Sequence, residues 1–163
     1  MIEWIKQIEK GFSQLKGEAA VKWDCVEMAL SEDPVQWYSP DIEYLQCARV
    51  DIHLENGKTF SLMTYQDDDE FGLFINMDMP PVNIVESPES IFRYRELVEL
   101  PAGLITEVSI KKNPSGNIAA LDLFVNENKV SFIAAEVDLH PDGSYCIREM
   151  DESILIQVND KRP

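Results

Sequence analysis

The segment VDIHLENGKTFSL, residues 50–62, predicts a β-hairpin and with it a strand-rich fold. On both sides of Asn56-Gly57 apolar residues alternate with polar ones, which is the period of a strand with one buried face. A two-residue loop would put the two apolar sets on opposite faces, whereas a three-residue loop pairs Ile52 with Phe60 and keeps the sets together. We therefore predict the three-residue loop, which directs His53 to the outer face.

The residues before this hairpin predict a helix and then a strand. Apolar residues recur at spacings of three and four over residues 2–16, and Gly17 follows where a helix end favours a left-handed residue. Alternating apolar residues then predict a strand at Val21, Trp23 and Cys25. After the hairpin, the same alternation predicts a short strand at Phe71, Leu73 and Ile75.

Residues 88–98 fit two different elements. Ser87, Pro88 and Glu89 match an N-cap, a first-turn proline and an acid that complements the helix dipole, so a helix of about ten residues is one prediction. The alternation of Phe92 and Tyr94 with polar residues also permits a strand.

The chain from about residue 104 onward predicts an antiparallel meander of five strands. Four-residue loops at 113–116 and 126–129 would place Val108 beside Leu123 and Leu123 beside Phe132. A three-residue loop at 141–143 would pair Leu139 with Tyr145 and Val137 with Ile147, and a turn at Asp151-Glu152 would pair Ile147 with Ile156. We expect one α+β domain over 1–163, with the N-terminal helix packed on a mainly antiparallel, hairpin-rich sheet; on the first of the two predictions for 88–98, a second helix packs there as well.

The composition is that of a globular but strongly acidic protein. Apolar residues make up 45% of the chain, and 14 basic residues against 30 acidic ones leave a formal net charge of −16. Nucleic acids and anionic membranes recruit Lys and Arg clusters, so direct contact with either is disfavoured. A basic partner is favoured instead.

The cysteines and the N-terminus predict a cytoplasmic protein. Cys25, Cys47 and Cys146 are odd in number and far apart, so we expect free, buried thiols rather than disulfides or a zinc ribbon. The N-terminal residues lack the uninterrupted apolar core of a signal peptide, and no apolar run approaches the roughly 20 residues of a membrane span. No cofactor is expected.

Two stretches without Lys or Arg, residues 23–48 and 59–92, concentrate acidic residues among aromatic ones. The cluster Asp67-Asp68-Asp69-Glu70 lies between Tyr65 and Phe71 and has two main interpretations, a solvated turn or an interface with a basic partner. A metal site fits less well, because the cluster lacks the alternate acids, central glycine and distal glutamate of a calcium loop.

Catalytic motifs are absent from the sequence. It contains no nucleophile elbow, phosphate-binding loop, dinucleotide fingerprint or zinc-protease motif. His140 precedes the turn Pro141-Asp142-Gly143 and is expected to be an exposed turn histidine. Nothing in the sequence pairs His53 with a cysteine as a catalytic dyad, so an enzyme would depend on carboxylates, and Asp151-Glu152-Ser153 are explained better as turn residues.

A small acidic α+β chain of this kind resembles the immunity proteins of bacterial polymorphic toxin systems, including those of contact-dependent growth inhibition. The resemblance rests on size, charge, the acidic aromatic segment 65–74 and the hairpin-rich tail ending Asp151-Glu152-Ser153-Ile154-Leu155. It implies a protein that covers the basic active site of a cognate toxin, such as a nuclease, with acidic residues in place of substrate phosphates.

The residues expected to bind such a partner supply either charge or aromatic anchors. They are Asp67, Asp68, Asp69 and Glu70 for charge, and Tyr65, Phe71 and Trp37 as anchors. Two alternatives stay open: an acidic module that binds several basic proteins or mimics nucleic acid, and an enzyme with paired carboxylates in a deep cleft.

Overall fold

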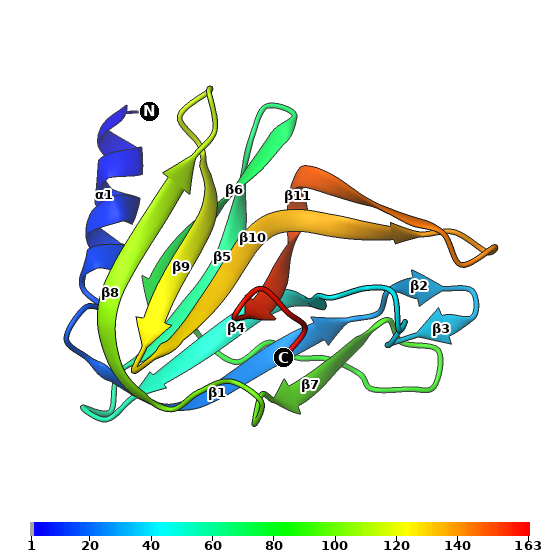
Figure 1. The fold of residues 1–163 in the computed structure, drawn as a ribbon, viewed down its shortest axis with the longest axis horizontal. Coiled ribbons are helices and arrows are strands. Elements are labelled where there is room, and N and C mark those ends of the chain that lie inside the picture. Colours follow the sequence, from blue (N-terminus) through cyan, green and yellow to red (C-terminus); the bar gives the residue numbers. More distant parts are fainter. Residues whose placement is uncertain (1) are drawn as a thin grey trace.

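The computed structural model describes residues 2–163 and consists of one helix and a large antiparallel sheet (Figure 1). The helix α1 spans Ile2–Ser13, and a separate small hairpin pairs β2 (Ser31–Glu32) with β3 (Val35–Gln36). The nine-stranded sheet has the order β6-β5-β4-β11-β10-β9-β8-β1-β7. Its strands are β1 (Ala19–Met28), β4 (Leu45–Leu54), β5 (Thr59–Asp67), β6 (Glu70–Met77), β7 (Phe92–Glu96), β8 (Gly103–Lys112), β9 (Ile118–Val125), β10 (Asn128–Leu139) and β11 (Tyr145–Val158).

The sheet curls until β1 also pairs with β4, which closes β4, β11, β10, β9, β8 and β1 into a ring. The β5–β6 hairpin and β7 extend the sheet beyond this ring. The β10–β11 hairpin also runs out of the ring and projects above β2 and β3 (Figure 1).

The main core lies where the apolar faces of the curled sheet meet the helix. Trp23 is 2% exposed, stacks on Phe132 and donates its indole N–H to the Pro101 carbonyl at 2.9 Å. The apolar stripe of α1, including Ile5, Ile8 and Phe12, is buried in the same cluster. The predicted N-terminal helix is therefore confirmed, although it ends at Ser13 and continues as turns to Gly17.

The hairpin that the sequence predicted at residues 50–62 is present with the predicted register. Ile52 faces Phe60 and Val50 faces Leu62 across β4 and β5, and both pairs contribute to the core. Gly57 adopts φ +88°, the left-handed conformation that closes the loop. The α+β class with a mainly antiparallel sheet is likewise confirmed.

The second helix predicted over 88–98 is wrong, and the alternative strand is right. Ser87 to Ser90 form only a single turn, closed by the Ser90 amide on the Ser87 carbonyl at 3.0 Å. Phe92 to Glu96 form β7 and pair with β1, from Phe92 opposite Met28 to Glu96 opposite Asp24. Pairing with β1 satisfies the backbone groups along one side of β7, and a capping pattern alone does not outweigh this pairing.

In the C-terminal region two predicted registers are right and two are wrong. Val108 faces Leu123, and Leu139 faces Tyr145, as predicted. The loop after β9 has only two residues, so Leu123 faces Val130 rather than Phe132. A shift of two residues keeps every side chain on its own face, and for this reason the apolar pattern could not detect it.

The turn predicted at Asp151-Glu152 is also wrong, because β11 is one continuous strand. Ala134 faces Ile154 and the next residue, Ala135, faces Glu149, so residues 150–153 bulge out of the ladder. Met150 adopts φ +56° there. The tail thus has four strands instead of five, and Ile156 faces Phe132 rather than Ile147.

The cysteines follow the prediction in two cases of three. Cys25 and Cys47 are buried and free, whereas Cys146 is free but exposed. Burial raises the pKa of the Cys47 thiol well above its usual value, and the adjacent Cys25 adds to this shift. In the described part of the chain, no helix is both long and apolar enough to span a membrane.

Candidate functional site

The predicted acidic cluster forms the free end of the β5–β6 hairpin, and its first three members are named here the acidic tip: Asp67, Asp68 and Asp69. Asp68 and Asp69 are exposed, and Asp68 adopts φ +54°, which closes the turn. Among residues 2–163, no basic side chain comes within ion-pair distance of these three carboxylates. Their charge is therefore left to solvent or to a partner.

Glu70, the fourth predicted acid, is engaged inside the protein. Its Oε2 accepts the side-chain amides of Asn113 at 2.7 Å and Asn117 at 2.9 Å. These hydrogen bonds stabilise the carboxylate and lower the pKa of Glu70, with that of Asn117 making the largest contribution. Glu70 thus ties the hairpin to the loop between β8 and β9.

Tyr65 is part of the same support and offers little surface to a partner. It is 7% exposed, donates its hydroxyl to Asn117 Oδ1 at 3.0 Å and accepts the Ile118 amide at 3.2 Å. Its ring and that of Trp4 meet in a T-shaped arrangement, with 4.6 Å between ring centroids. Burial raises the pKa of Tyr65. Phe71 is half-buried and remains available at the side of the hairpin.

A second acidic segment, which the sequence assigned to a turn, lies beside the hairpin. The Thr64 hydroxyl of β5 donates to the Glu152 carbonyl at 2.7 Å, across a separation of 88 residues. Glu152 is exposed and belongs to the β11 bulge. The bulge therefore lies against β5, and only the tertiary contact reveals it.

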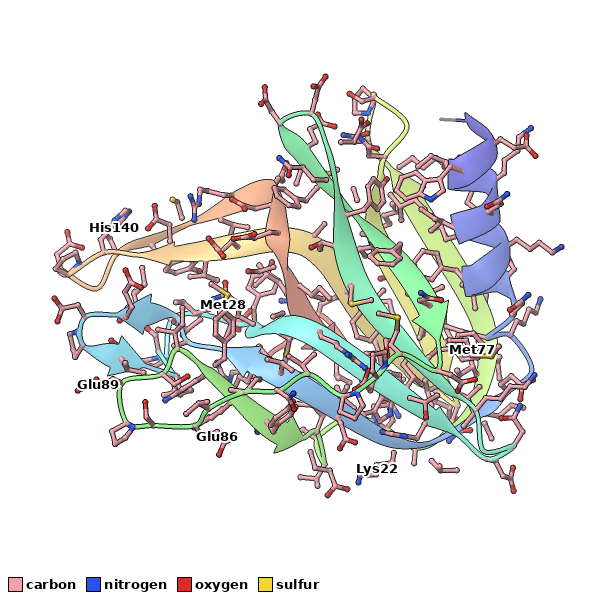
Figure 2. All side chains as sticks on the ribbon, turned by 180° about the vertical axis from the view of Figure 1, so that it is seen from behind. Lys22, Met28, Met77, Glu86, Glu89 and His140 are labelled. Atoms are coloured by element: carbon pink, nitrogen blue, oxygen red, sulfur yellow. The ribbon has the colours of Figure 1, made fainter. Side chains whose placement is uncertain are left out.

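Trp37 is not close to the acidic tip. It follows β3, at the end of the molecule where the β2–β3 hairpin lies, whereas the tip is the free end of β5–β6 (Figure 1). The Arg93 guanidinium lies over its ring at 4.1 Å from the centroid, and both residues line a cavity of about 380 Å³ with Glu86. Glu86 and Glu89 lie on the long loop outside the sheet (Figure 2). The two acidic stretches of the sequence meet here, away from the tip.

A cavity of about 670 Å³ opens on the outer face of β1, β4, β5 and β7 beneath residues 78–82. Its acidic lining residues are Asp24, Asp51, Asp78 and Glu96, and its basic ones are Arg49 and Arg95. Apolar parts of the wall come from residues such as Met79, Pro81 and Val82. The cavity thus combines an apolar wall with an excess of carboxylates.

Both arginines of the cavity are already engaged. Arg49 binds Asp51 at 2.9 Å, the Pro80 carbonyl at 2.8 Å and the Ser61 hydroxyl at 3.1 Å. Arg95 pairs with Glu27, which is 1% exposed, and with Glu99. Neither guanidinium is free to receive an anion, so the cavity suits a cationic guest.

A hydrogen-bonded chain crosses the cavity from β1 to β5. His53 Nε2 lies 2.7 Å from Asp24 Oδ2, and His53 Nδ1 lies 3.1 Å from the Thr59 hydroxyl. The order carboxylate, imidazole, hydroxyl is that of an activated nucleophile. Both arginines of the cavity are committed, however, so neither guanidinium is available to stabilise a developing oxyanion.

Sequence reasoning missed the cavity because its residues come from four strands and a loop. Residues 24, 53 and 59 share no local spacing, and only the pairing of β1 with β4 brings Asp24 and His53 together. Alternation placed His53 on the outer face, which is correct, but gave no information on the partner strand. No protein-family model, curated protein or solved structure matches this chain.

Proposed function

We propose that this protein binds a basic protein partner through the acidic tip, and that it acts as an immunity protein which neutralises a bacterial toxin with a basic active site. The observation that carries the proposal is the set of unpaired carboxylates at Asp67, Asp68 and Asp69 on a turn that Tyr65 and Glu70 hold in place. Carboxylates held in a fixed arrangement lose little conformational entropy on binding. They would occupy the positions of substrate phosphates in a toxin such as a nuclease.

The arginines do not neutralise the acidic tip, because they make contacts elsewhere within the protein. Arg49, Arg93, Arg95 and Arg148 pair with carboxylates, and Arg162 donates to the Tyr44 carbonyl at 3.0 Å. With a formal net charge of −16, the surface would attract a basic partner from a distance and raise the association rate.

The large cavity supports the same proposal at a second point of contact. Its engaged arginines and remaining carboxylates favour a lysine or arginine side chain as the guest, whose aliphatic part would lie against Met79 and Val82. A partner with a basic surface provides such side chains. The cavity would then add specificity to the attraction of the acidic tip.

The test is calorimetric titration of the purified protein with the protein encoded directly upstream of its gene, which this proposal identifies as the toxin. We expect a complex with Kd below about 1 μM that weakens as salt is raised. The triple variant D67N/D68N/D69N should weaken it at least tenfold, which corresponds to about 1.4 kcal/mol.

A matched control removes the same amount of charge elsewhere. The triple variant E3Q/E107Q/E127Q neutralises exposed carboxylates on α1, β8 and the turn after β9. We expect it to change the affinity less than about threefold, since charges at a distance are screened by salt. Absence of a complex, or equal effects of the two triple variants, would overturn the proposal, and tight binding to several unrelated basic proteins would favour the general acidic module instead.

A further inference from the structure

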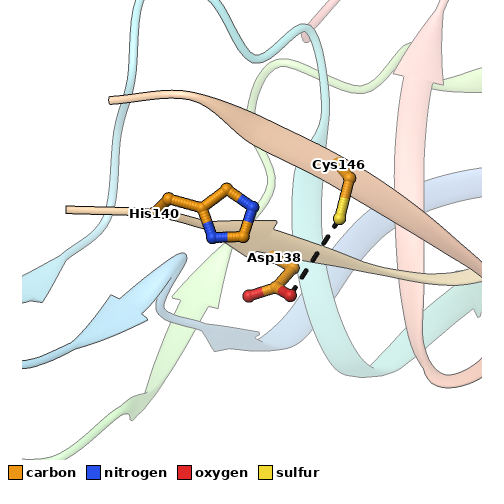
Figure 3. Close-up of side chains that lie close together, drawn as sticks. All are labelled: Asp138, His140 and Cys146. Atoms are coloured by element: carbon orange, nitrogen blue, oxygen red, sulfur yellow. Dashed lines mark hydrogen bonds between the residues drawn. The ribbon is translucent and has the colours of Figure 1, made fainter. Parts of the chain in front are cut away.

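We propose that Asp138, His140 and Cys146 form a binding site for a zinc-like divalent metal ion at the end of the β10–β11 hairpin. Asp138 and His140 are two residues apart, so they lie on the same face of the extended chain. Cys146 is directly opposite Asp138 in the strand register. Strand pairing therefore places all three side chains on one face, which Figure 3 shows.

The distances between the three ligand atoms are close to those of a metal site. One carboxylate oxygen, one imidazole nitrogen and the thiol sulfur all lie within 4.8 Å of one another, and Cys146 Sγ is 4.0 Å from Asp138 Oδ2. A tetrahedral zinc ion with bonds of about 2.0–2.3 Å holds its ligand atoms about 3.3–3.8 Å apart. Small rotations of these side chains, of which His140 and Cys146 are exposed and Asp138 is half-buried, would close this gap.

The turn that carries the ligands is held by its own hydrogen bonds. The His140 amide donates to the Ser144 carbonyl at 2.8 Å, and the Gly143 amide donates to the His140 carbonyl at 3.0 Å. Asp142 accepts both the hydroxyl and the amide of Ser144. Asp142 thus fixes the loop and leaves the three ligands free to face an ion.

The chemistry of the three ligands selects a borderline metal. Thiolate and imidazole disfavour magnesium and calcium, which prefer oxygen ligands, whereas zinc accepts sulfur, nitrogen and oxygen together. On binding, the Cys146 S–H bond breaks, its proton passes to solvent and a bond from sulfur to metal forms, with no change of oxidation state. Three protein ligands leave a fourth position for water or for a group from a partner.

The test uses cobalt(II) as a coloured substitute for zinc. The full chain without a histidine tag, kept reduced with a phosphine, is titrated with cobalt(II) and then with zinc. We expect a sulfur-to-cobalt charge-transfer band that zinc abolishes. Cys146→Ser should remove the band although the buried Cys25 and Cys47 remain. His140→Ala and Asp138→Asn should each weaken zinc binding at least about tenfold. Loss of a residue that only supports a metal ligand already lowers metal affinity by about tenfold or more, and loss of a ligand itself should not cost less.

The controls separate this site from general attraction of cations to an acidic protein. Glu127→Gln changes an exposed acid at a different turn and should leave the zinc affinity within about twofold. Thermal unfolding without metal should be similar for all variants, since the turn is exposed. Absence of the charge-transfer band, its persistence in Cys146→Ser, or equal zinc binding by every variant would overturn the proposal.

Discussion

The β5–β6 and β10–β11 hairpins both extend beyond the closed ring of strands, but they are supported at different places (Figure 1). In the first, the buried amide of Asn117 binds Tyr65 and Glu70 close to the turn. In the second, the buried amide of Gln46 accepts the Val137 amide at 2.8 Å and donates to the Ala29 carbonyl at 3.0 Å, well before the turn. One hairpin is held near its end and the other nearer its base.

This difference matches the two kinds of binding that we propose. The acidic tip presents its charge on a braced turn, which suits recognition of a surface with a fixed shape. Beyond Leu139, residues 140–146 of the other hairpin are all exposed, and Figure 2 shows His140 far out on it. An exposed end with few tertiary contacts can adjust its side chains around a small ion.

The strongest disruption of the braced hairpin should come from Gly72→Ala. A Cβ atom at Gly72 would lie 2.4 Å from the Tyr65 ring, and the ring is held by Asn117 and Trp4 and has little room to move. Overpacking of this kind costs about 1–3 kcal/mol, and we expect a value near the upper end. Urea unfolding followed by circular dichroism measures the loss.

A double-mutant cycle identifies the cause of this loss. In a Tyr65→Ala background the ring is absent, so the added methyl group of Gly72→Ala should cost less than about 0.5 kcal/mol. An equal cost in both backgrounds would show that the ring does not restrict Gly72.

The supporting amide of the other hairpin should matter less for global stability and more for local motion. Gln46→Ala leaves the buried Val137 amide and the Ala29 carbonyl without a partner, and an unsatisfied buried group costs about 1–3 kcal/mol. Hydrogen exchange should show faster exchange at residues 135–139, with protection of residues 60–66 unchanged. Equally faster hydrogen exchange in both hairpins would contradict the inference that each hairpin is supported independently.

The sequence predicted the fold best where burial is periodic and the turn is short. The hairpin at residues 50–62 combines both signals, so its class, loop and register were all correct. Residues 88–98 carried a capping pattern, but their conformation depends on pairing with β1, and Arg93 and Arg95 reach the buried Glu27 from that position. A pattern within ten residues carries no information on such a distant partner.

The candidate sites divide in the same way. The acidic tip is contiguous in sequence and could be located in advance, although burial of Tyr65 and the hydrogen bonds of Glu70 could not. The cavity and the cluster of Asp138, His140 and Cys146 depend on strand register. The register of β10 with β11 near residues 137–147 was in fact predicted correctly, so facing residues 138 and 146 were within reach of the sequence.

The smallest expected effect is the pH dependence that Glu70 gives to the braced hairpin. The folded pKa of Glu70 is lowered, chiefly by its hydrogen bond from Asn117 and then by that from Asn113, so folding favours the ionised form. Its contribution is therefore complete above the unfolded pKa of a glutamate, about 4.3, and is lost as the pH falls through the lower folded pKa. We expect Glu70→Gln to be less stable than the parent protein at pH 7, and the difference should shrink towards pH 3.

Urea unfolding at a series of pH values measures this difference directly. Asp69→Asn is the matched control, because Asp69 lies one residue away and accepts no hydrogen bond from the described side chains. Its difference from the parent should stay nearly constant with pH. If Glu70→Gln and Asp69→Asn gave the same pH profile, the hydrogen bonds of Glu70 would contribute nothing beyond the charge of one more carboxylate. Support of the β5–β6 hairpin near its turn would then depend on Tyr65 and Asn117 alone.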